Sequence, residues 1–242
     1  MIIESLKLRH FRNYISMEVE FSPWFNIISG PNGSGKTNIL ESISILSGIK
    51  SFRNVRDTDI IQWGCDSYYC STTVCGSINS LFEIGCALQL DRIKKRAKID
   101  GEEITSLTDY IGKLLTVVFS PSDINIINGS PDLRRRFFDN ILSRVDREYL
   151  TALVDFKRVL QNRNRMLKLS RPGSIDHSEL DVWDELFSLN ASVLTRKRKN
   201  FIERFKPVFS AAFCGISGSC DIPEIDYTGN YIDLNPGRSS KT

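Results

Sequence analysis

Hydrophobic and polar residues alternate along several stretches in the first half of the chain. The alternation runs through residues 2–8 and 17–21, and it returns in three stretches between residues 68 and 104. Successive side chains of a β-strand point to opposite faces of a sheet, so a period of two predicts strands that are buried on one face. Short turns at 76–79 and 100–101 then predict an antiparallel meander.

Two other runs are almost wholly apolar, namely residues 24–28 and 114–119. Uninterrupted apolar runs of this length are typical of strands that are covered on both faces, so both runs are predicted to be buried strands. The second run leads into residues 120–123, with the sequence SPSD. This order predicts a helix start, with a hydroxyl at the N-cap, proline next, and an acid that completes a capping box.

A helical period replaces the alternation after Ser130-Pro131, a second cap-like pair. Apolar residues recur three and four positions apart through residues 133–141, 149–167 and 183–201, with a break at 170–174. The pattern predicts two long helices that form an antiparallel hairpin within a helical subdomain. Beyond Pro207, further apolar residues predict returning strands: Ile222, Ile225, Tyr227 and Ile232.

The clearest chemical signal is the phosphate-loop pattern G-x-x-x-x-G-K-[ST], which is satisfied by Gly30-Pro31-Asn32-Gly33-Ser34-Gly35-Lys36-Thr37. A helix with apolar residues at helical spacing is predicted to follow the loop and to end at Gly48. Unpaired N–H groups and the helix dipole favour an anion at such a helix start. Lys36 can reach the β and γ oxygens of a nucleotide, and the hydroxyl of Thr37 can ligate Mg²⁺. The alternative is an ordinary glycine-rich turn.

Two other nucleotide motifs are not found in the sequence. The apolar run 114–119 leads into Ser120, whereas the corresponding strand of many phosphate-loop ATPases ends in an acid that holds magnesium. An N-K-x-D guanine-reading motif is also absent, which favours ATP over GTP. The residues therefore predict nucleotide binding and leave hydrolysis unassigned.

The composition is that of an ordinary globular protein: 242 residues, 41% hydrophobic and 25% charged, with a net charge of +3. No apolar run is long enough to cross a bilayer and the N-terminus lacks a secretory pattern, so we expect a cytoplasmic protein without a membrane partner. Six cysteines occur without a C-x-x-C pair: Cys65, Cys70, Cys75, Cys86, Cys214 and Cys220. We expect reduced thiols rather than a zinc site.

Seven segments spread over nearly the whole chain carry a further signal. They are LRHFRNY (8–14), TNILE (37–41), KSFR (50–53), VFSPSD (118–123), GSPDLRRRFFD (129–139), LQNRN (160–164) and WDE (183–185). In these segments the sequence resembles the RecF family of bacterial recombination mediators, which is related to the ABC-type ATPase heads of SMC proteins. The phosphate loop alone fits many families, whereas the run 129–139 is far more specific.

The resemblance implies an α/β phosphate-loop NTPase of ABC/SMC-head type with an inserted helical lobe. It predicts an ATP-binding lobe at 1–120, a helical lobe with a hairpin at 121–206, and a return to the first lobe at 207–242. It also implies binding of single-stranded or gapped DNA, ATP-dependent homodimerisation, slow DNA-dependent ATP hydrolysis, and recombinase loading with other mediator proteins in repair, replication restart and the SOS response. In that family the signature motif and the acidic magnesium strand lie further on than residue 242, which puts hydrolysis by this chain in doubt.

The resemblance also assigns site residues. Asn32, Gly33, Gly35, Lys36 and Thr37 are expected to contact the phosphates and magnesium, and Asn38 to continue the helix start. Arg12 and Asn13 occupy a turn that approaches the nucleotide in SMC-type heads, although an arginine in a turn is more often solvated. Ser122 and Asp123 lie where such heads place a glutamine that senses the γ-phosphate, and the different residue types weaken that transfer.

DNA contacts are predicted from local charge. The candidates are Lys94, Lys95, Arg96 and Lys98 in the meander, and Arg196, Lys197, Arg198 and Lys199 on the second long helix. Solvated surface is the alternative for both groups. Two functions are alternatives to a DNA repair ATPase. The first is a small-molecule kinase, for which a meander and a helical hairpin are a poor fit. The second is a nucleotide-gated interaction module without hydrolysis.

Overall fold

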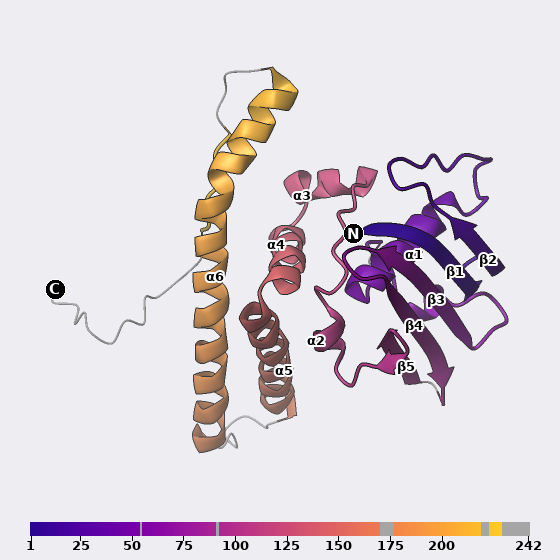
Figure 1. Ribbon diagram of the computed structural model, residues 1–242. Helices are drawn as coiled ribbons and strands as arrows, with labels where there is room; N and C mark the ends of the chain where they lie inside the picture. The colour runs from indigo at the N-terminus through magenta and orange to yellow at the C-terminus, as the bar shows by residue number, and fades with distance from the viewer. Residues whose placement is uncertain (54, 91, 170–176, 219–222, 229–242) are drawn as a thin grey trace. The chain divides into compact units, whose positions relative to one another are not determined.

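An antiparallel sheet organises the N-terminal part of the chain (Figure 1). The chain divides into two units, Met1–Leu150 and Thr151–Thr242. The computed structural model describes five stretches of the chain: residues 1–53, 55–90, 92–169, 177–218 and 223–228. The lobe boundaries at residues 120 and 206 remain a prediction.

The sheet has six strands in the order β2-β1-β3-β4-β5-β6, and each neighbouring pair is antiparallel. The strands are β1 (Ile2–Phe11), β2 (Tyr14–Glu20), β3 (Ser67–Cys75), β4 (Ser80–Gln89), β5 (Arg92–Ile99) and β6 (Glu102–Glu103). The predicted strands at 2–8 and 17–21 and the predicted meander are therefore confirmed. They form one continuous sheet because β1 pairs with β3.

Helix α1 (Lys36–Gly48) packs on one face of this sheet (Figure 1). The core contains fully buried Leu6, Leu8 and Ile84 from the strands. Part of the buried surface of α1 is small and polar: the hydroxyls of Ser42 and Ser47 each donate to a backbone carbonyl three residues earlier in the helix. These buried hydroxyls are thus satisfied within the helix itself.

The predicted helix ends at Gly48, as expected, although one of its apolar residues, Leu40, is 49% exposed. The left-handed residue that follows the helix is Ile49, with φ of 65°. The Ile49 N–H donates to the Ile45 carbonyl (2.7 Å) and the Ile49 side chain is buried, so burial offsets the strain of this conformation.

The prediction of buried strands at 24–28 and 114–119 is wrong. Neither run is a strand, and neither pairs with any part of the chain that the structure describes. Leu114 is buried, but Trp24 is 91% exposed and Val117 is 99% exposed. An apolar extended segment becomes a strand only when a neighbour takes its backbone N–H and C=O groups. Hydrophobicity alone does not supply that neighbour.

The helix starts predicted after residue 119 are confirmed. The helices that follow the sheet are α2 (Leu107–Tyr110), α3 (Asn125–Asn128) and α4 (Pro131–Val145), with a 3₁₀ helix at Pro121–Ile124. The N–H of Ser120 donates to the Asp123 carboxylate (2.7 Å) in a capping box, and Ser130 is the N-cap of α4. Arg144 of α4 donates to the Thr116 carbonyl (2.8 Å) and lies against Gly48, where a helix C-terminus favours a cation.

Two long helices dominate the second unit, and the predicted hairpin is confirmed. They are α5 (Arg147–Leu169) and α6 (His177–Ser217). Arg163 of α5 pairs with Asp184 of α6, and the rings of Phe156 and Phe187 lie 4.9 Å apart. No described helix combines the length and the hydrophobicity that a membrane span requires.

The helical pattern was identified in the sequence for residues 183–201, whereas α6 continues through Pro207 to Ser217. Four phenylalanine rings, spaced four residues apart, form a row along α6. Each ring contacts the next, and the row extends from before Pro207 to after it: Phe201, Phe205, Phe209 and Phe213. The returning strands are not found in residues 223–228. The predicted positions Ile222 and Ile232 lie outside the described residues.

Replacing Tyr110 with phenylalanine should raise the free energy of unfolding by about 1 kcal/mol, because a buried hydroxyl without a partner is costly. The Tyr110 ring packs edge-on against Phe82 at 5.9 Å, and its hydroxyl has no hydrogen-bond partner among the described residues. Urea unfolding would measure the change. Tyr149→Phe is the matched control: the Tyr149 hydroxyl donates to Asp139, so this variant should be destabilised. A destabilised Tyr110→Phe would contradict the expectation.

Candidate nucleotide-binding site

The phosphate-loop segment, residues 30–37, leads directly into the first turn of α1. Lys36 is the first residue of that helix, and its ammonium donates to the carbonyls of Gly30 and Pro31 (both 2.7 Å). These two bonds keep the ammonium over the loop. The N–H groups of Lys36 and Thr37 lie in the first helical turn, where no intrahelical acceptor is available. The loop therefore offers a cation and free N–H donors at one place.

The turn between β1 and β2 contacts this loop. Asn13 donates to the carbonyl of Ser34 (3.1 Å), and Asn38 donates to the side-chain oxygen of Asn13 (2.9 Å). Gly35 lies beneath the turn with φ of 100°, and a Cβ at this position would come within 2.6 to 2.7 Å of Asn13 and Tyr14. Only glycine fits this close approach. The structure thus brings Asn13 to the phosphate loop.

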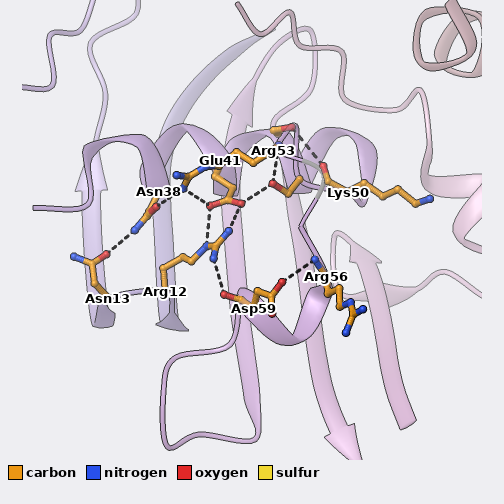
Figure 2. Close-up of polar contacts among 10 residues, drawn as sticks. Arg12, Asn13, Asn38, Glu41, Lys50, Arg53, Arg56 and Asp59 are labelled. Atoms are coloured by element: carbon orange, nitrogen blue, oxygen red, sulfur yellow. Dashed lines mark hydrogen bonds and ion pairs between the residues drawn. The ribbon is translucent and has the colours of Figure 1, made fainter. Parts of the chain in front are cut away.

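Arg12 points to a different partner. Its guanidinium makes two bonds to the Glu41 carboxylate, from Nε (2.9 Å) and Nη2 (2.7 Å), and Nη1 donates to the carbonyl of Asp59 (2.6 Å), as Figure 2 shows. Glu41 is fully buried in α1. In this structure Arg12 anchors the turn to α1, and its direct contact with a nucleotide stays a prediction.

The segment after α1 completes this network, which we call the Glu41 network: Arg12, Asn38, Glu41, Ser51 and Arg53. Ser51 donates to the Glu41 carboxylate (2.5 Å), and Arg53 Nη1 donates to the Asn38 side chain (3.2 Å). Sequence reasoning missed Glu41, Ser51 and Arg53 as site residues. A signal was available, because Glu41 is a charged residue among the apolar and small positions of α1.

The residues present fit a nucleotide phosphate and a magnesium ion. Lys36 would face the terminal phosphates, and Thr37 would offer its hydroxyl to Mg²⁺. Burial raises the pKa of the nearby Tyr14 hydroxyl above its usual value, so it stays neutral beside the loop at physiological pH. Asn32, Gly33 and Ser34 line the open side of the loop as exposed residues. Asp123 and Ser122 are engaged in the capping turn at Ser120.

The meander cations fall on two faces of β5. Lys94, Arg96 and Lys98 lie on one face, together with Arg92, which sequence reasoning did not include. Lys95 faces inward: its ammonium-bearing side chain is 7% exposed and bonds to Asp57 (2.5 Å) and to the Ile49 carbonyl (2.8 Å). The period of two therefore separates Lys95 from its neighbours.

The second predicted cluster lies on α6. Arg196, Lys197 and Arg198 each have interactions with other residues, and Lys199 is exposed. Since three of these four cations are engaged, the β5 face is the better candidate for a phosphate-binding surface.

Known proteins resemble this chain in sequence and fold. Residues 2–118 match the family model "RecF/RecN/SMC N terminal domain". The chain is 34% identical over 234 residues to the DNA replication and repair protein RecF of Leptospira interrogans, covering 96% of this chain and 63% of that protein. The RecF of Heliobacterium modesticaldum is 35% identical over 231 residues, covering 96% and 62% respectively.

The fold comparison agrees. A solved structure of the recombination mediator protein RecF with ATP, in the RecFOR pathway, superposes with a TM-score of 0.84 at 27% identity, over 93% of this chain and 63% of that chain. A second RecF structure gives a TM-score of 0.82 at 29% identity, over 89% and 58%. The predicted ABC/SMC-head type of α/β fold is confirmed. The chain spans less than two thirds of the length of these relatives.

Proposed function

Because this chain belongs to the RecF family, we propose that it binds ATP with Mg²⁺ at its phosphate loop and binds DNA in recombinational repair. The proposed substrate is single-stranded or gapped DNA. ATP-dependent homodimerisation and recombinase loading with other mediator proteins are part of the same proposal. The chain spans 63% of the Leptospira relative, so these activities are proposed for the whole protein.

One observation supports nucleotide binding most directly. The Lys36 ammonium lies over the loop on two backbone carbonyls, next to the free N–H groups of the α1 start. An incoming phosphate can replace these carbonyls as the partner of the ammonium without a large rearrangement. Charge-assisted bonds of this kind are about twice as strong as neutral ones.

The outer face of β5 supports DNA binding. Four cations occupy alternate positions, Arg92, Lys94, Arg96 and Lys98, so they lie roughly 7 Å apart along one line. Arg96 is 3.5 Å from Glu103, both half-exposed, whereas Lys94 and Lys98 have no ion pair among the described residues. Such a row can neutralise several phosphates of one strand without reading its sequence.

Replacing Lys94 and Lys98 with glutamine should weaken binding of a gapped DNA by about tenfold near 0.1 M salt, equally for different sequences. The slope of log K against log salt should fall by about 0.9 for each phosphate that is no longer neutralised, so by about 1.8 in total. Fluorescence anisotropy over a salt series would measure both quantities. Lys113→Gln, on a loop of the same unit, is the control and should leave the slope unchanged. An unchanged slope in the double variant would contradict the assignment.

The proposed function as a whole is tested by DNA binding with and without ATP. ATP should strengthen binding of gapped DNA by the whole wild-type protein and should leave binding by its Lys36→Ala variant unchanged. Sedimentation of the same samples would detect a homodimer that forms only with ATP. A whole wild-type protein that binds DNA equally with and without ATP would contradict the proposed coupling.

A further inference from the structure

Glu41 is a carboxylate that the fold buries completely, five positions after Lys36 in the sequence. Burial of a charge is costly unless donors surround it. An ionised carboxylate has about four acceptor positions. Glu41 accepts three hydrogen bonds, from Arg12 Nε (2.9 Å), Arg12 Nη2 (2.7 Å) and Ser51 Oγ (2.5 Å), and forms an ion pair with Arg53 Nη1 at 3.6 Å. Partners from two separate parts of the chain therefore compensate the buried charge.

The two arginines around Glu41 are held differently. The Arg12 side chain is 17% exposed, and all three of its nitrogens donate to Glu41 or to the Asp59 carbonyl. The Arg53 side chain is 44% exposed, and only its Nη1 is used, toward Glu41 and Asn38. The Nε and Nη2 groups of Arg53 donate to no described residue. Arg12 is thus a fixed structural cation, whereas Arg53 keeps free donors at the surface.

The position of Arg53 is fixed by its backbone as well. The Arg53 N–H donates to Ser51 Oγ (3.0 Å), and the same hydroxyl donates to Glu41 (2.5 Å). The side chain then reaches Asn38, in the first turn of α1 and two residues after Lys36 (Figure 2). The Arg53 guanidinium consequently lies beside the N-terminal end of α1, where an anion would be favoured.

We propose that Glu41 is a positioning residue that holds Arg53 beside the first turn of α1, so that the free donors of Arg53 bind a phosphate oxygen of a nucleoside triphosphate. The proposal rests on nucleotide binding at the phosphate loop, as proposed above. Glu41 acts directly on the guanidinium and through Ser51 on the backbone. It does not touch the nucleotide.

The test is the coupling between Arg53 and its two supports in binding of a fluorescent ATP analogue with Mg²⁺ to the full chain. Arg53→Ala should weaken binding by about fivefold to tenfold in the wild-type background. The same substitution should cost less than about twofold in the Ser51→Ala and Glu41→Gln backgrounds, because Arg53 is no longer held in place. If Glu41 and Ser51 were merely structural, Arg53→Ala would cost the same factor in every background, and that result would overturn the proposal.

Ser51→Ala keeps the Arg12–Glu41 pair, so it carries the test even if Glu41→Gln fails to fold in a thermal unfolding control. Lys50→Ala is the matched control, since this exposed cation of the same segment extends away from Glu41 (Figure 2) and should change binding by less than about twofold. Lys36→Ala separates the two proposals. If it leaves binding intact, the nucleotide site itself is wrong; if it abolishes binding while Arg53 shows no coupling, only the role of Glu41 is wrong.

Discussion

Arg12→Ala should lower the free energy of unfolding by about 3–5 kcal/mol, measured by urea unfolding at neutral pH. The variant removes both bonds that Arg12 makes to Glu41 and the bond to the Asp59 carbonyl. Glu41 is fully buried, so water cannot replace the missing donors without opening the core around α1. The cost is mainly that of a buried charge without a strong partner, rather than that of the pairing itself.

Arg53→Ala is the matched control for stability, because it removes an arginine from the same carboxylate. That pair is 3.6 Å apart and the Arg53 side chain is 44% exposed, so the expected loss is below about 1 kcal/mol. The loss in the free energy of unfolding should therefore be clearly larger for Arg12→Ala than for Arg53→Ala. Equal losses in the two variants would show that burial of the pair does not decide its contribution.

Lys36→Ala should weaken binding of an ATP analogue by about 100-fold or more. The ammonium is the cation that the loop presents next to the α1 start. Loss of about two charge-assisted bonds from this ammonium to phosphate oxygens would account for an effect of this size. Isothermal titration with Mg²⁺ present would measure the dissociation constant.

The control for Lys36→Ala is Lys113→Ala, which removes a lysine from a loop of the same unit. Its dissociation constant should match that of the wild-type chain, and the thermal midpoints of both variants should lie close to that of the wild type. Normal affinity in Lys36→Ala would contradict the nucleotide site.

The sheet and the long helices could be predicted from the sequence because their signals are local. Period-two patterns with short turns locate β3, β4 and β5, and the three-four rhythm locates α5 and α6. The failures have two causes. Residues 24–28 and 114–119 have the composition of buried strands, but strand pairing depends on partners elsewhere in the chain. Strands were expected beyond Pro207, but α6 continues through this proline to Ser217.

The candidate site was predictable in part. Residues 30–37 form a recognisable loop because glycine spacing and Lys36 are fixed by the chemistry of phosphate binding. Arg12 was expected to contact the nucleotide. In the structure its guanidinium binds the carboxylate of Glu41, which is 29 residues further along the sequence. Sequence reasoning cannot match a buried carboxylate with its arginine across such a separation. The same holds for Lys95, whose partner Asp57 comes from a different segment.

The connectivity of the sheet has a consequence for the order of folding. β3, β4 and β5 are joined by short turns, so they can pair early at a small cost in chain entropy. β1 pairs with β3, and Ile2 lies opposite Cys75. This pairing closes a long loop between the two strands, and that loop contains the phosphate loop and α1. Arg12 and Asn13 follow β1 directly, so their bonds to Glu41 and Ser34 come with the same step. The phosphate loop is therefore expected to reach its final shape late in folding, after the sheet around it has closed.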